Sequence, residues 1–343
     1  MLRKTIKTIW VIVIIFVLII NSEIKAFSST NIKKTINVGV ILFSLDNSIM
    51  QQLKQELENL QEENQIKVSV FDAQNNISLQ NQILDSLLKS KVDLIITMPV
   101  DTRENSVRDF ISRVKPYSIP LIMFDITPEV VKKVSKDYDK VAFTIPDSEK
   151  AGEMQGEIIS DFWNNNSIKD KKGDGTLQYV LLRGPTNDII ANMRIKGLNL
   201  AIEKSGMKTE LIQSLATNWT KEIAKSYIEN IFITYSSKID AIIANDDDLA
   251  VGAIEALQKY GYNKGDNSKI IPVFGIDGSS EAKKLIDKGL MSATVGMDLE
   301  KVAQDFYTIG INLVNNVNPI ENTNLKSEDG VIIIETNLKK YIK

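Results

Sequence analysis

The sequence predicts an α/β fold of two Rossmann-like lobes, each a parallel sheet with helices on both faces. Three observations indicate it. The length of 343 residues exceeds the usual single core. Short runs are apolar throughout rather than alternating, and longer segments with helical periodicity separate these runs. Continuously apolar strands that alternate with helices are typical of parallel sheets covered on both faces.

The alternation of strands and helices occurs twice along the chain. In the first half, strands are expected over residues 37–42, 67–71, 94–96 and 121–124, and helices over residues 50–63, 79–90 and 103–114. From near residue 150, strands are expected over residues 179–182, 241–243 and 272–275, and helices over residues 151–163, 191–204, 250–260 and 280–288. Each half therefore predicts one α/β lobe.

The residues just after the predicted strands are the first candidates for function. In open parallel sheets, ligands bind beyond the carboxyl ends of the strands. These ends carry Asn47, Met98, Asp125, Asp188, Asp246 and Asp277. Two lobes that face each other across such ends form a cleft at a domain boundary, which is a preferred place for small-molecule sites.

Composition excludes several classes of function. The 41 basic and 44 acidic side chains form no basic patch for nucleic acid, and 43% hydrophobic residues suit a globular protein. The chain has no cysteine and no histidine, which excludes disulfides, thiol nucleophiles, Ser-His-Asp triads and the commonest zinc ligands. An enzyme is the least favoured class, because only carboxylate chemistry by a pair such as Asp246 and Asp277 is left.

The first 26 residues predict export. Arg3, Lys4 and Lys7 precede an apolar run over residues 9–20, which has the length of a signal-peptide core and is short for a membrane span. Residues 1–26 are expected to be a signal peptide or an uncleaved membrane anchor through residues 9–20. The protein is therefore expected in the periplasm or at the outer face of the cytoplasmic membrane.

Several segments, in order and spacing, resemble the periplasmic sugar-binding proteins of the ribose/galactose type. They are FDAQN at 71–75, QYVLLRG at 178–184, Trp219, IANDD at 243–247 and IPVFGID at 271–277. The resemblance covers residues 38 to about 317 and implies two lobes joined by three crossovers, near residues 125–127, 296–299 and 330–333. The expected lobes are then residues 35–125 with 299–331 and residues 127–296 with 333–343.

The resemblance also implies a ligand pocket. Its expected residues are Asn47, Met98, Asp188, Arg194, Trp219, Asp246, Asp277 and Met297. Trp219 stands where the family stacks an indole on the sugar, and Arg194 and Asp277 stand where it uses an arginine and a carboxylate for sugar hydroxyls. This chemistry suits a sugar, because a pyranose has an apolar face while its hydroxyls accept from a guanidinium and donate to a carboxylate in charge-assisted hydrogen bonds.

Other positions depart from the hexose-binding pattern. Met98 and Met297 replace asparagines, Ile190 replaces an aspartate, Asp188 replaces a histidine and Ile49 replaces a second stacking aromatic. A buried hydroxyl without a partner costs about 1–3 kcal/mol. A ligand other than glucose or galactose is therefore expected, such as a pentose or a deoxy sugar.

A polar loop over residues 170–178 resembles a calcium loop of the same family and the start of an EF-hand loop. The expected ligands are Asp170, Asp174, Thr176, Gln178 and the distant Asp240. Lys172 falls at a ligand position, and an ammonium does not coordinate a cation. A structural calcium ion and a plain polar turn therefore remain equal alternatives, and no other cofactor is expected.

The favoured function is a monomeric binding module that presents a small sugar to the permease of an ABC-type importer. The alternative is a sensor subunit, anchored by an uncleaved leader, that docks on a membrane receptor or histidine kinase. A transcriptional repressor needs a helix-turn-helix ahead of Thr35, and none fits there.

Overall fold

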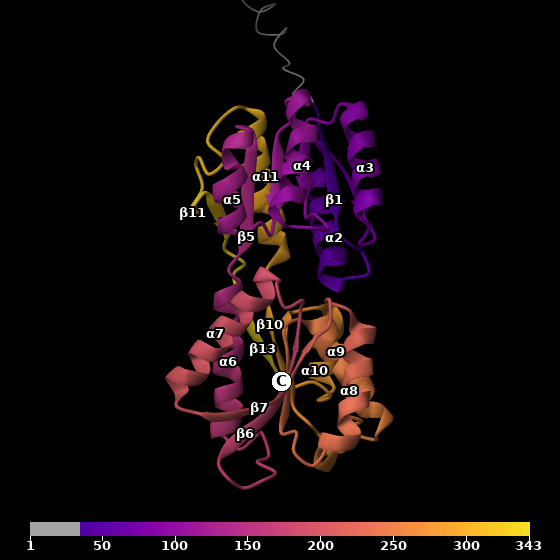
Figure 1. The fold of residues 1–343 in the computed structure, drawn as a ribbon, viewed down its shortest axis with the longest axis vertical. Helices are drawn as coiled ribbons and strands as arrows, with labels where there is room; N and C mark the ends of the chain where they lie inside the picture. Colours follow the sequence, from indigo (N-terminus) through magenta and orange to yellow (C-terminus); the bar gives the residue numbers. More distant parts are fainter. Residues whose placement is uncertain (1–34) are drawn as a thin grey trace, which may run out of the picture. The chain divides into compact units, whose positions relative to one another are not determined.

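The computed structural model describes residues 35–343 and gives two sheets of mostly parallel strands with helices on both faces (Figure 1). The prediction of an α/β fold of two lobes is confirmed. The leader and the apolar run over residues 9–20 lie outside the described residues. Among residues 35–343, no helix has the length and hydropathy that a membrane crossing requires.

The first sheet has seven strands. Their spatial order is β11 (Lys326–Glu328), β12 (Val331–Ile334), β5 (Val141–Pro146), β4 (Leu121–Phe124), β3 (Leu94–Thr97), β1 (Ile36–Leu42) and β2 (Ile66–Asp72). All neighbours are parallel except β11 and β12. One face packs against α2 (Ser48–Glu63) and α11 (Leu299–Val314), and the other against α3 (Ile77–Ser90), α4 (Glu104–Val114) and α5 (Pro128–Val134).

The second sheet has six strands. Their spatial order is β13 (Lys339–Ile342), β10 (Ala293–Gly296), β9 (Val273–Asp277), β8 (Ala241–Ala244), β6 (Thr176–Arg183) and β7 (Lys208–Ala216). Only β13 runs antiparallel to its neighbour. One face packs against α6 (Ser148–Asn164) and α7 (Ile189–Ser205), and the other against α8 (Lys221–Tyr235), α9 (Asp247–Lys259) and α10 (Ser280–Asp287).

The pairing of β5 corrects two of the expected crossovers. Because β5 pairs in parallel with both β4 and β12, residues 126–146 belong to the first lobe, and the prediction of a crossover near residues 125–127 is wrong. The chain leaves the first sheet only after Pro146, where α6 begins. Likewise, β12 pairs with β5 up to Ile334, so the third crossover spans residues 335–338 rather than 330–333. The second lies between β10 and α11, at residues 297–298.

Candidate functional site

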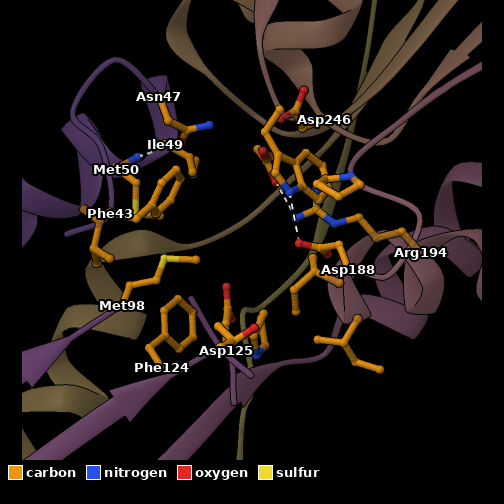
Figure 2. Close-up of a pocket in the computed structure, with 18 of the residues that line it drawn as sticks. Phe43, Asn47, Ile49, Met50, Met98, Phe124, Asp125, Asp188, Arg194 and Asp246 are labelled. Atoms are coloured by element: carbon orange, nitrogen blue, oxygen red, sulfur yellow. Dashed lines mark hydrogen bonds and ion pairs between the residues drawn. The ribbon is translucent and has the colours of Figure 1, made fainter. Parts of the chain in front are cut away.

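A cavity of about 480 Å³ lies among residues that follow the carboxyl ends of strands from both sheets. All eight residues that the sequence named as ligand-binding line it: Asn47, Met98, Asp188, Arg194, Trp219, Asp246, Asp277 and Met297. Figure 2 shows Arg194 and Asp246 across an open space from Ile49 and Met98. A cavity of this size is in the range that small-molecule sites occupy.

Arg194 is the central polar group of the cavity. Its side chain is 6% exposed, and its Nη1 and Nη2 atoms donate to the Asn245 carbonyl oxygen at 2.6 Å and to Asp277 Oδ1 at 2.7 Å. Helix α7, which carries Arg194, packs very closely against α6. A Cβ at Gly152 of α6 would lie only 1.9 Å from the Arg194 carbonyl oxygen, so only glycine fits there. The close packing of the two helices and the two hydrogen bonds hold the guanidinium in place.

Trp219 is fixed through its indole N–H. Nε1 donates to Asp188 Oδ2 at 3.1 Å, while Asp188 Oδ1 accepts from the Ala191 backbone N–H and caps α7. A Cβ at Gly184 would lie 2.3 Å from Trp219 Cζ2, so only glycine leaves room for the ring there. The Arg194 guanidinium carbon lies 5.9 Å from the centre of the ring. Asp188 therefore serves two elements: it begins α7 and orients the indole.

Three consecutive aspartates at the start of α9 have three different environments. Asp246 is the N-cap of α9, with Oδ1 accepting from the Leu249 N–H, and it also lines the cavity. Asp247 is fully buried and accepts from the Ser279 N–H and the Thr294 hydroxyl, which ties α9 to the start of α10 and to β10. Asp248 Oδ2 accepts from the Ser48 N–H at 3.0 Å and joins the first turn of α2 to the first turn of α9. Only Asp246 of the three belongs to the cavity.

The buried carboxyl groups around the cavity have little positive charge nearby to neutralise them. Burial raises the pKa of Asp125 to about 8, helped by the negative charges of Asp188 and Asp277. Burial also raises the pKa of Asp277 to about 6, although Arg194 opposes the shift, and it raises the pKa of Asp246 well above its ordinary value. Burial disfavours the charge of Arg194, but Asp277 and Asp246 outweigh it and raise the pKa of the guanidinium. One guanidinium therefore faces several buried carboxyl groups.

The part of the cavity wall that comes from the first lobe is largely apolar. Its apolar lining residues are Phe43, Ile49, Met50, Leu53, Met98, Phe124, Leu299 and Val302. Met297, from the second crossover, adds to it. The polar residues here are Asn47, Asn75, Thr102 and Asp125. Asn47 Oδ1 caps α2 by accepting from the Met50 N–H, which leaves its Nδ2 for a ligand. Apart from these residues the lining is apolar on the side of the first lobe, whereas it is polar on the side of the second.

A family model described as the periplasmic binding protein domain matches residues 38–316. The chain belongs to the periplasmic binding protein family. It is 27% identical to the D-galactose/methyl-galactoside binding periplasmic protein of Haemophilus influenzae, over 98% of this chain and 99% of that one. It is 26% identical to the ribose import binding protein of Bacillus subtilis, over 81% of each.

Solved structures share the fold of this periplasmic binding protein. A solute binding protein of Bacillus halodurans with bound myo-inositol matches with a TM-score of 0.68 at 22% identity, over 91% of this chain and 96% of that one. One of Actinobacillus succinogenes with bound D-allose matches with a TM-score of 0.71 at 18% identity, over 90% and 98%. The matched proteins are binding proteins, and membership of this family makes the chain a binding protein rather than an enzyme.

Several residues that line the cavity are not among the eight expected ones, including Phe43, Phe124, Asp125 and Thr336. Asp125 follows a predicted strand and is one of the first candidates named from the sequence, but the resemblance implies no role for it. Phe43 and Phe124 supply aromatic rings on the same wall as Ile49. Phe43 directly follows an apolar strand and Phe124 ends one, and this position is the feature of the sequence that could have indicated them. Thr336 lies in the third crossover, and nothing in its local sequence marked it.

In the loop over residues 170–178, the expected calcium ligands bond to backbone N–H groups and to one another. Asp170 accepts from the Gly173 and Gly175 N–H groups, and Asp240 accepts from the Lys171 and Gln178 N–H groups. Asp174 and Gln178 bond to each other, Thr176 donates its N–H to Asp174, and Lys172 pairs with Glu210 at 2.5 Å. Among residues 35–343 no group of three or more acidic side chains is placed to hold a metal ion. A calcium ion takes six to eight oxygen ligands, so a structural calcium ion at this loop stays a prediction.

Proposed function

We propose that this periplasmic binding protein is an extracytoplasmic carrier that closes around a small sugar and presents it to an ABC-type importer. The observation that carries the proposal is the arrangement of Arg194, Asp277 and Trp219 around one cavity between two lobes. The names of the Haemophilus and Bacillus relatives support a sugar, and the Bacillus and Actinobacillus structures hold a cyclitol and a sugar.

The chemistry of these three residues supports a hydroxylated ring. An indole offers a flat apolar surface on which the C–H face of a sugar ring packs. The Arg194 and Asp277 pair offers a donor and an acceptor side by side, which matches a hydroxyl that both accepts and donates. No catalytic group is needed, because closure of two lobes joined by crossovers around a ligand is the whole mechanism.

The ligand is proposed to differ from glucose and galactose. Met98, Met297 and Ile190 line the cavity without a polar group that reaches a hydroxyl, apart from weak thioether acceptors. A hexose hydroxyl against this part of the lining would lose its water without gaining a partner, at about 1–3 kcal/mol each. A pentose or a deoxy sugar has fewer hydroxyls that need hydrogen-bond partners and can place C–H groups against the apolar lining.

Calorimetric titration of the purified protein against hexoses, pentoses and deoxy sugars tests the proposal. The expected result is one-to-one binding of at least one pentose or deoxy sugar, at least ten times tighter than binding of glucose or galactose. Micromolar binding of galactose would contradict the altered specificity but leave the carrier function standing. Absence of binding by every sugar would contradict the carrier function itself.

The carrier and the sensor alternative share this clamp and differ in residues 1–26. The N-terminal sequence of the native protein separates them. A start near Phe27 is expected for the carrier, and retention of Met1 in the membrane fraction would favour the sensor.

A further inference from the structure

The cavity lining holds more acceptors than donors and more negative than positive charge. Its acidic residues are Asp125, Asp188, Asp246 and Asp277, and its uncharged polar residues are Asn47, Asn75, Thr102, Asn218, Thr220 and Thr336. Within residues 35–343, Arg194 is the only cationic side chain that lines the cavity. Four carboxyl groups therefore share one guanidinium.

Arg194 is already committed to one of these carboxyl groups. Nη2 donates to Asp277 and Nη1 to the Asn245 carbonyl oxygen, and Nε has no partner in the described chain. Asp188 accepts hydrogen bonds from the Ala191 N–H and the Trp219 indole N–H. Both donors are neutral, so neither cancels the negative charge of Asp188. The guanidinium thus neutralises Asp277 and leaves the charge of the other carboxyl groups to be compensated.

Asp125 is the carboxyl group with the least compensation. Its side chain lines the cavity, the residue is 7% exposed, and no donor reaches Oδ1 within residues 35–343. Figure 2 shows its carboxyl group at the edge of the open space, beside Phe124. A buried carboxylate without a hydrogen bond or counter-charge is costly, and desolvation and the neighbouring aspartates raise its pKa to about 8. A ligand in the cavity can supply the missing donor.

The neighbours of Asp125 suit a cation as well. An ammonium group has three donors and no acceptor, the reverse of the lining, whereas a hydroxyl brings one donor and no charge. Aromatic rings and thioethers surround the same space: Trp219, Phe43, Phe124, Met98 and Met297. Ring faces attract cations, and apolar surroundings strengthen a charge-assisted hydrogen bond.

We propose that the solute carries a protonated amine, as in an amino sugar or an aminated cyclic polyol, and that its ammonium group binds the Asp125 carboxylate. The inference rests on the proposed function, since it assigns the class of ligand to the same cavity. The ring of the solute then lies against Trp219 and its hydroxyls meet the Arg194 and Asp277 pair.

Calorimetry with matched pairs of probes tests this inference. The probes are glucose and galactose and their 2-amino-2-deoxy and 6-amino-6-deoxy derivatives, at pH 7. At least one amine is expected to bind ten or more times tighter than its neutral parent. Asp125→Asn, which keeps the shape and removes the charge, is expected to abolish that preference. Asp109→Asn, an exposed change on α4 of the same lobe, is the matched control and is expected to keep it.

Each outcome decides between the two proposals. Binding of neutral sugars at least as tight as binding of every amine overturns the amine inference and leaves the carrier function standing. Equal weakening of amine and neutral parent by Asp125→Asn also overturns it, because Asp125 then only accepts from a hydroxyl. Absence of binding by this panel and by the pentoses and deoxy sugars overturns both.

Discussion

The two walls of the cavity differ in how their residues are held and in what they offer a ligand. The wall from the second lobe presents Arg194, Asp277 and Trp219, each fixed by hydrogen bonds or close packing to the fold. The wall from the first lobe presents Ile49, Met98 and other apolar side chains that are held by packing alone. From this difference we infer that the second lobe orients the ring and the hydroxyls of the ligand, and that the first-lobe wall, apart from Asp125, selects against further hydroxyls.

The largest effect is expected from breaking the buried ion pair. Arg194→Met leaves Asp277 and Asp246 without their counter-charge, and removal of one partner of a buried pair costs about 3–5 kcal/mol. Chemical denaturation of the variant is expected to show a loss of this size. In the double variant Arg194→Met with Asp277→Asn, part of the stability is expected to return, because the uncompensated charge is gone. A loss below about 1 kcal/mol in the single variant would show that the pair does not hold this wall together.

The second effect concerns the pH dependence of stability. Asp125 and Asp247 have pKa values of about 8 in the folded protein, against 3.8 for an ordinary aspartate, so the folded state holds protons that the unfolded state has lost. The stabilisation of the folded state by these two protonated carboxyl groups is complete below about pH 4 and is lost as the pH rises through 8. The free energy of unfolding of the ligand-free protein is therefore expected to fall between pH 5 and pH 8, by about 1 kcal/mol per pH unit for each group.

Denaturation at a series of pH values checks this slope. Asp125→Asn is expected to flatten it, and Asp109→Asn is expected to leave it unchanged. The carboxyl groups with lowered pKa values, such as Asp101 and Glu153, titrate below this window and do not contribute. A stability that rises from pH 5 to pH 8 would be inconsistent with protonated carboxyl groups in the cavity.

The sequence was informative for the fold and for the second-lobe wall, for different physical reasons. Continuous apolar strands and periodic helices determine the layers, and polar residues after strands such as β6, β8 and β9 must lie at one edge of a parallel sheet. The predicted strands do not include Val141–Pro146, so the predicted first lobe ends too early. The register of a strand and the strands it pairs with depend on residues far apart in the sequence, so they cannot be predicted from a short apolar run alone.

The apolar wall was predicted only in part for a related reason. Met98 stood at a strand end, but the rings of Phe43 and Phe124 reach the cavity through the geometry of the fold rather than through a local pattern. Thr336 reaches it from a crossover whose position depends on the pairing of β12 with β5.

The third effect tests whether the apolar wall excludes hydroxyls. Met98→Asn restores an amide at a position that lines the cavity and is expected to strengthen galactose binding about tenfold, the value of one hydrogen bond in a desolvated site. Calorimetric titration measures the change. Met193→Asn, a partly buried methionine that packs in the core and does not line the cavity, is the control and is expected to have no such effect. Unchanged galactose affinity in Met98→Asn would mean that the first-lobe wall does not set specificity.

The smallest effect is expected at the contact between the lobes. Asp248→Ala removes the acceptor for the Ser48 N–H at the start of α2, a partly exposed contact worth about 0.5–1 kcal/mol. The affinity for the tightest ligand is expected to fall about two- to fivefold with little change in the free energy of unfolding. Asp109→Ala is the control. A fall of a hundredfold would place Asp248 among the groups that touch the ligand.

The most direct test of the account is the same titration on the wild type and on Trp219→Ala, with the tightest ligand from the sugar and amino sugar panel. The account predicts one-to-one binding by the wild type and a loss of a hundredfold or more in the variant, because the indole is the stacking surface of the cavity and is positioned by Asp188 and Gly184. Circular dichroism confirms that the variant is folded. Equal affinity of the two folded proteins would contradict the assignment of this cavity as the ligand site.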